Sequence, residues 1–241
     1  MRIKNYNNIY QISFLAYVFP INCYIYEETD SLTLIDIGTN FFCRPLLQLS
    51  HKLNKPITKI VITHPHMDHV AGLDSIVSAL PGVRIYISER DLALLKGDLS
   101  IHSYEENDTI KGGFTKLQTL PDQFVKDGDY IGSLKVISTP GHTPGSISLY
   151  DEKDAAIIAG DALQVKGGLS VAGDKRILFP FPALATWSLK RAIESAKLIQ
   201  SLELSLLATG HGDMIKDPKE KLSKAIQRAE ARLKNEKSKN Q

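Results

Sequence analysis

The stretch Thr63-His-Pro-His-Met-Asp-His-Val-Ala-Gly72 places four potential metal ligands within positions 64–69. These are His64, His66, Asp68 and His69, and they directly follow an apolar segment with the character of a β-strand. Loop side chains at the carboxyl end of a strand can converge on one point. Alternate side chains of an extended segment share a face, so the first two histidines can lie together, whereas Asp68 and His69 follow where the chain turns into a helix. Two directions indicate two metal ions.

Three further candidate ligands, His142, Asp161 and His211, each follow an apolar strand and a glycine. A lone histidine is most often a surface or satisfied core residue, and a carboxylate after a buried strand can cap a helix instead. Five of the seven histidines share this loop context, which makes the ordinary roles a poor explanation of the set. His51 and His102 lack such a context, and we predict that they are ordinary surface residues.

The composition favours a small partner. A chain of 241 residues can bury a core without disulfide or metal staples, so stability does not explain a metal. Its 29 basic and 27 acidic residues leave a formal charge of +2, which gives no electrostatic reason to expect nucleic acid or an anionic membrane surface. We therefore expect a small-molecule substrate, no nucleic acid and no membrane partner. The oligomeric state is not readable from the sequence.

The sequence gives no indication of export. Cys23 and Cys43 lack a CxxC spacing, so we expect free thiols in a reducing compartment. The apolar stretch 9–26 is interrupted by polar residues and Pro20 and shows no small-residue cleavage site, which favours two strands. No run approaches the roughly 20 apolar residues of a membrane helix. We predict a cytoplasmic protein.

Strand and helix patterns alternate along the chain, which favours α/β layering over an all-β sandwich. Apolar, β-branched and aromatic runs predict strands within 9–19, 22–28, 32–38, 58–63, 83–88 and 205–208, and several more within 124–161. Helical spacing predicts helices at 42–53, 70–79, 90–95, 187–202 and 218–237. No linker, repeat or low-complexity tract is visible, so we predict one domain over residues 1–241.

The segment 164–186 shows no periodicity, and loops of this length without secondary structure are usually functional or mobile. We consider it a candidate lid over the substrate. Its Phe179 and Phe181 allow two interpretations: they form an apolar wall beside the substrate, or they only pack the loop against the domain.

Taken together, these residues resemble the metallo-β-lactamase superfamily. The histidine and aspartate series occurs in that family's order, and the run Leu-Ile-Asp-Ile-Gly at 34–38 resembles its early Asp-Gly strand end. The resemblance covers roughly residues 10–215. It implies a four-layered αββα sandwich, in which two central sheets have helices outside and the metals lie at one sheet edge.

The resemblance also implies a role for each residue. It assigns a first metal ion to His64, His66 and His142, a second to Asp68, His69 and His211, and a bridging position to Asp161. Asp36 is implied to orient a ligand without binding metal. The implied cofactors are two divalent ions, zinc before others, although imidazole and carboxylate ligands also accept iron or manganese.

Such a pair of ions lowers the pKa of a shared water and polarises the group under attack, which makes a metal-dependent hydrolase the predicted function. Asp68 is the expected proton shuttle, and a small ester, thioester or lactone is the expected substrate. No G-x-S-x-G elbow offers a protein nucleophile instead. Thirty residues follow His211, so we expect no long helical C-terminal domain of the glyoxalase II kind. Lactonases of the family carry a tyrosine three residues after the bridging aspartate, where this chain has Gln164.

Three alternatives remain open at this point. Persulfide dioxygenases use the same scaffold with one redox-active iron, so an iron-dependent oxidoreductase is the first. A phosphodiesterase or nuclease on the same scaffold is the second, although no basic arm or inserted domain is visible. A binding or regulatory protein with a vestigial site is the third. Metal content and a hydrolysis panel separate them.

Overall fold

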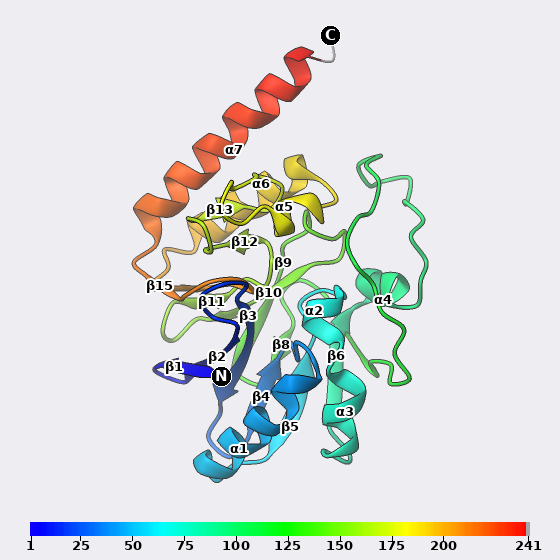
Figure 1. Cartoon of the computed structure of the whole chain (residues 1–241), viewed down its shortest axis with the longest axis vertical. Coiled ribbons are helices and arrows are strands. Elements are labelled where there is room, and N and C mark those ends of the chain that lie inside the picture. Colours follow the sequence, from blue (N-terminus) through cyan, green and yellow to red (C-terminus); the bar gives the residue numbers. More distant parts are fainter. Residues whose placement is uncertain (240–241) are drawn as a thin grey trace.

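The computed structural model describes residues 1–239 and contains two large β-sheets (Figure 1). The first sheet has seven strands in chain order: β1 (Arg2–Tyr6), β2 (Ile9–Phe14), β3 (Ile21–Glu27), β4 (Leu32–Ile35), β5 (Ile57–Val61), β6 (Arg84–Ser88) and β7 (Gln123–Val125). Strands β1 to β4 pair antiparallel, and β4 to β7 pair parallel.

The second sheet has six strands in the order β15-β14-β11-β10-β9-β8. Their bounds are β8 (Tyr130–Ile131), β9 (Leu134–Ser138), β10 (Ile147–Asp151), β11 (Ala156–Ile158), β14 (Leu206–Ala208) and β15 (Ile215–Lys216). Strands β11 and β14 run parallel, whereas the other neighbours are antiparallel. A separate small ribbon joins β12 (Leu163–Gln164) to β13 (Ser170–Val171).

Helices cover the outer faces of both sheets. The helices of the described residues are η1 (Asn40–Phe42), α1 (Cys43–Leu53), α2 (Met67–Val70), α3 (Leu73–Ser78), α4 (Glu89–Leu95), α5 (Phe181–Leu184), α6 (Leu189–Ser201) and α7 (Lys219–Lys239). Figure 1 shows α6 and α7 on one side of the molecule and α1 and α3 on the opposite side, with the sheets between. Among the described residues, no helix combines the length and apolar character needed to cross a membrane.

Alternation along single strands divides the interior into layers. Ile60 of β5 packs outward with α1 and α3, whereas its neighbour Val61 packs inward against the other sheet. In the second sheet Ile157 packs outward with α6 and α7, and Ile158 packs inward. Strands buried on both faces require such continuous apolar runs. The result is the expected αββα sandwich, in which both sheets share one inner core; the prediction of a single domain over 1–241 stays a prediction.

The predicted helix at 70–79 is wrong in its bounds, because the chain forms α2 and α3 with a break at Gly72. A side-chain carbon at Gly72 would lie 2.7 Å from Ile37 Cγ2 and 2.9 Å from the Thr39 carbonyl oxygen. The amide of Gly72 donates to the Gly38 carbonyl at 3.0 Å. Tight packing against the loop after β4 therefore interrupts the helix at Gly72, and the part before the break, α2, begins at Met67.

Two further differences from the sequence prediction concern the edge strand β1 and the segment 164–186. Strand β1 was not predicted, since its sequence is polar and largely exposed, as is usual for an edge strand. The segment 164–186 contains the end of β12, β13 and the short helix α5. Phe179 within it is 1% exposed, whereas Phe181 is 52% exposed. One aromatic residue thus packs the segment down, and the other remains available at the surface.

Helix α6 approaches the loop after β9 so closely that this loop requires glycine. Gly141 has φ +145°, and a side-chain carbon there would lie 2.4 Å from both Cα and N of Ala192. Gly141→Ala must shift the α6 backbone, and we expect it to lower the free energy of unfolding by roughly 3 kcal/mol or more in urea denaturation.

The matched control is Gly82→Ala, because Gly82 has φ +80° and no atom within 4 Å of the added carbon. It should cost about 1 kcal/mol, the backbone penalty alone. Equal losses in the two variants would contradict the contact with α6.

Candidate metal centre

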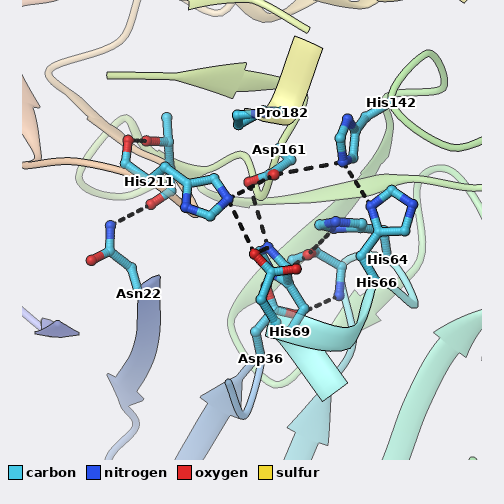
Figure 2. A network of polar contacts seen from close by, with 12 residues as sticks. Asn22, Asp36, His64, His66, His69, His142, Asp161, Pro182 and His211 are labelled. Atoms are coloured by element: carbon cyan, nitrogen blue, oxygen red, sulfur yellow. Dashed lines mark hydrogen bonds and ion pairs between the residues drawn. The ribbon is translucent and has the colours of Figure 1, made fainter. Parts of the chain in front are cut away.

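The seven predicted ligands lie together at one edge of the sandwich, where strands from both sheets end. His64 and His66 follow β5, while Asp68 and His69 lie on α2. From the second sheet, His142 follows β9, Asp161 follows β11 and His211 follows β14. Figure 2 shows six of these side chains directed toward one another. Three overlapping groups have potential ligand atoms within 4.8 Å of one another: His64, His66 and His142; His64, His69 and Asp161; Asp68, His69 and His211.

Asp161 lies between the two sides of the cluster. Its Oδ2 is 3.1 Å from His211 Nε2 and 3.5 Å from His142 Nε2, and its Oδ1 is 3.6 Å from His69 Nε2. Asp68 Oδ2 is 3.4 Å from His211 Nε2. The Asp161 carboxylate thus faces His142 on one side and His69 and His211 on the other, the position that a bridging group would occupy.

The outer ring nitrogens of three histidines bond to groups that can only accept a hydrogen bond. His69 Nδ1 is 2.7 Å from the Asp36 carboxylate, as expected for a residue that orients a ligand. His66 Nε2 is 3.0 Å from the backbone carbonyl of Lys111, and His211 Nδ1 is 2.6 Å from that of Pro20. Each of these nitrogens must therefore carry a hydrogen.

The remaining two histidines face threonine hydroxyls whose single hydrogen is already donated elsewhere. Thr63 Oγ1 donates to Asp36 at 2.7 Å and so accepts from His64 Nδ1 at 3.1 Å. Thr186 Oγ1 donates to the Pro182 carbonyl at 2.7 Å and so accepts from His142 Nδ1 at 3.1 Å. All five outer nitrogens are thereby donors, and the five inner nitrogens are left to face the cluster.

Several inner atoms have no hydrogen-bond partner although they are fully buried. These atoms are His64 Nε2, His69 Nε2 and Asp161 Oδ1. In addition, His66 Nδ1 and His142 Nε2 face each other at 2.9 Å with no hydrogen between them in the assigned tautomers. Buried polar atoms without partners are costly, and a cation among them removes that cost. The donor set of nitrogen and carboxylate oxygen atoms fits zinc, iron or manganese.

Electrostatics divide the cluster into two halves. On the first, burial lowers the pKa of His64 and His142 well below the usual value, and it lowers that of His66 as well. These three imidazoles are therefore neutral, which is the form that binds metal.

On the second half, burial lowers the pKa of His69 and His211, but neighbouring carboxylates outweigh it. Asp36 and Asp161 raise the pKa of His69 well above its usual value, and Asp161 raises that of His211. Burial raises the pKa of Asp161, yet the same two histidines hold it well below the usual range. Charge pairs thus stabilise this half, and a metal must displace protons from it.

The loop 98–122 covers His66, although no sequence pattern had assigned this loop to the site. Besides the Lys111 carbonyl, the Phe114 ring lies 5.2 Å from the His66 ring, and the Met67 amide donates to the Gly113 carbonyl at 2.8 Å. A side-chain carbon at Gly112 would lie 2.0 Å from His66 Nε2. The only sequence signal was the Gly-Gly pair, because a backbone carbonyl has no residue signature.

Asp91 was missed as well, and it holds the loop that carries His142. It is fully buried at the start of α4, accepts from Thr143 Oγ1 at 2.6 Å and accepts from the Gly145 amide at 2.8 Å. His51 is exposed, and His102 lies at the surface against Tyr104, as predicted. Cys23 and Cys43 are both free.

Comparison with known proteins defines the class. The family model described as the metallo-beta-lactamase superfamily matches residues 16–211, and the chain belongs to this superfamily, whose members are generally metal-dependent hydrolases. It is similar to the uncharacterized protein YobT of Bacillus subtilis (strain 168), with 44% identity over 230 residues, 95% of this chain and 99% of that protein. A hydroxyacylglutathione hydrolase of Francisella tularensis subsp. novicida is 30% identical over 147 residues, 58% of this chain and 45% of the relative.

Two solved structures extend the comparison. The structure of TTHA1623 in a di-iron-bound form has a TM-score of 0.64 and 26% identity, and the match covers 87% of this chain and 96% of that one. A metallo-beta-lactamase from Pontibacter korlensis has a TM-score of 0.70 over 95% and 98% of the two chains, with 18% identity, which supports the fold alone.

The pH dependence of folding tests the Asp91 contacts. Burial raises the pKa of Asp91 to about 7, so between pH 4 and pH 7 the folded chain holds a proton that the unfolded chain has lost. Stability therefore falls as pH rises through this window, by up to roughly 4 kcal/mol for this group.

Asp91→Asn should flatten this pH dependence, since an amide can accept from Gly145 and donate to Thr143. Urea denaturation of both proteins at saturating metal, from pH 4.5 to pH 8, measures the difference. Parallel pH curves would show that Asp91 does not titrate in this window.

Proposed function

We propose that this protein is a hydrolase that uses two divalent metal ions, zinc before iron or manganese, to cleave a small ester, thioester or lactone. The observation that carries the proposal is the orientation of five buried imidazoles. Their outer N–H groups donate hydrogen bonds to surrounding oxygen atoms, which leaves five inner nitrogens and two carboxylates around one small volume. Membership of the superfamily supports it.

The residues of the cluster would bind the two ions in two groups. His64, His66 and His142 would hold the first ion; Asp68, His69 and His211 would hold the second, and Asp161 would face both. When bound, two such ions would lower the pKa of a water and polarise the carbonyl of the substrate. Asp36 holds His69 in its tautomer, and Thr186 does the same for His142.

Asp68 is suited to exchange protons with solvent. Its side chain is 30% exposed, whereas the side chains of His211 and Asp161 beside it are each 3% exposed. A carboxylate at the open side of the cluster can take a proton from the attacking water and return it to the leaving group.

Gln164 separates this site from that of the lactonases with a tyrosine at the corresponding position. Gln164 is 2% exposed and donates to the Phe179 carbonyl at 3.0 Å, so it holds the segment after β13 and offers no hydroxyl to a substrate. An open-chain ester or thioester is therefore favoured over an acyl-homoserine lactone. The substrate is proposed to be a small molecule, with no nucleic acid or membrane as partner.

Asp68→Asn tests the proton role. The variant should fold normally but lose at least 100-fold in kcat on the best ester or thioester, because the amide cannot carry the proton. Metal content measured on the same sample separates loss of a proton carrier from loss of an ion. Unchanged kcat would refute the role.

Metal content combined with a hydrolysis panel of lactones, thioesters and phosphodiesters tests the function. Wild type should hold two ions per chain and hydrolyse a carbonyl substrate, and His66→Ala should lose an ion and the activity. One iron per chain with oxygen consumption would assign the oxidoreductase instead. Selective phosphodiester cleavage would assign the nuclease class.

A further inference from the structure

Large apolar side chains are exposed on two segments next to the candidate metal centre. We call this set the apolar rim: Tyr17, Val18, Ile177, Leu178, Phe181 and Leu184. Their exposed fractions are 79%, 78%, 95%, 81%, 52% and 58%, respectively. Single exposed apolar residues are ordinary, but a gathering of this kind marks a binding surface.

The two segments of the rim are in contact with each other. The Phe19 ring lies 5.0 Å from both the Phe179 and the Phe181 ring, and those two lie 5.5 Å apart. The Lys166 ammonium donates to the Tyr17 carbonyl. The loop between β2 and β3 and the segment before α5 therefore form one continuous surface.

The same rings continue into the metal centre. The Phe19 ring is 6.0 Å and the Phe179 ring 5.3 Å from the ring of His211. On the opposite side, Phe114 faces His66, and Met67 is 52% exposed. The apolar rim therefore adjoins the metal centre, and the part of a substrate that extends from the centre toward Phe19 and Phe179 would contact apolar groups.

Two basic side chains near the rim donate hydrogen bonds to backbone carbonyls of the neighbouring loops. Arg176 donates to the Gly167 carbonyl at 3.0 Å, and Lys166 donates to that of Tyr17. The large exposed side chains of the rim are apolar, which matches hydrocarbon better than a charged carrier such as glutathione.

We propose that the substrate carries a medium-length hydrocarbon chain on its acyl side, and that this chain lies on the apolar rim. The inference rests on the proposed hydrolase function and names its substrate class. Hydrolysis of such a thioester breaks the bond between acyl carbon and sulfur, adds the hydroxyl of water to the acyl carbon and gives the hydrogen to the leaving thiol.

The test uses N-acetylcysteamine thioesters with acyl chains of two to ten carbons, each below its critical micelle concentration, and metal-loaded protein. A buried methylene contributes roughly three- to fourfold in affinity, and a half-exposed rim about twofold. The value of kcat/KM should therefore rise at least tenfold from the two-carbon to the eight-carbon substrate. Phe181→Ala should reduce that ratio at least fivefold.

Phe124→Ala is the matched control. Phe124 is 55% exposed on β7, and its neighbour Val125 packs between the sheets, so Phe124 points to the outer face. This variant should keep the ratio of wild type. A second rim variant, Ile177→Ser with Leu178→Ser, removes apolar surface from positions so exposed that folding does not depend on them.

Equilibrium binding of octanoate and butanoate by calorimetry tests the rim without turnover. Octanoate should bind at least tenfold more tightly, and Phe181→Ala should abolish most of that difference. If no thioester or ester is hydrolysed but octanoate binds more tightly than butanoate, the proposed hydrolase function is refuted, whereas the proposal that the rim binds hydrocarbon is supported.

Three results would overturn the rim proposal. The first is hydrolysis or binding that is independent of chain length. The second is a chain-length effect that appears only with micelles or vesicles, which would assign the rim to a lipid surface. The third is a dimer that Phe181→Ala dissociates, which would assign the rim to a second copy of the chain.

Discussion

The structure depends on hydrogen bonds that orient five imidazole rings through the ring nitrogens that point away from the cluster. Each outer nitrogen donates to a carboxylate, a backbone carbonyl or a hydroxyl whose own hydrogen is already engaged. The partners come from the loops after β2, β4 and β5, from the loop 98–122 and from the segment before α6. No local stretch of chain supplies them, so the two-sheet fold is what assembles the centre.

This arrangement is costly to the folded protein before a cation binds. His64 Nε2 is buried without a partner, and the His66 and His142 rings meet at 2.9 Å. The surrounding structure holds them by close contacts that only glycine permits, at Gly112 beside His66 and at Gly141 beside α6. The inner apolar core provides the rigidity for these contacts, because it joins the very strands whose ends carry the ligands.

Residue type and spacing predicted the candidate ligands and the alternation of strands and helices, whereas the two-sheet class was implied by the family resemblance. The sequence did not reveal the Lys111 and Pro20 carbonyls, because any residue carries such a group. It placed one helix at 70–79, since the contact of Gly72 with the loop after β4 is long-range. Asp91 looked like an ordinary polar residue of a short helix, because its partners Thr143 and Gly145 lie more than 50 positions away. Tertiary contacts of this kind leave no periodicity to read.

The rings of His211 and His66 adjoin aromatic groups on both sides of the centre, so the surroundings are apolar where the ligands are polar. Aromatic side chains that exclude water lower the local dielectric constant and so strengthen the electrostatic effect of a nearby charge. Asp68 differs from the buried ligands, because its side chain is 30% exposed.

The most direct test of the account is the tautomer of each imidazole in the metal-loaded protein, read from long-range ¹⁵N–¹H correlations of ring nitrogens. The account predicts hydrogen on Nδ1 of His64, His69, His142 and His211 and on Nε2 of His66. Hydrogen on the inner nitrogen of any of these rings would contradict it.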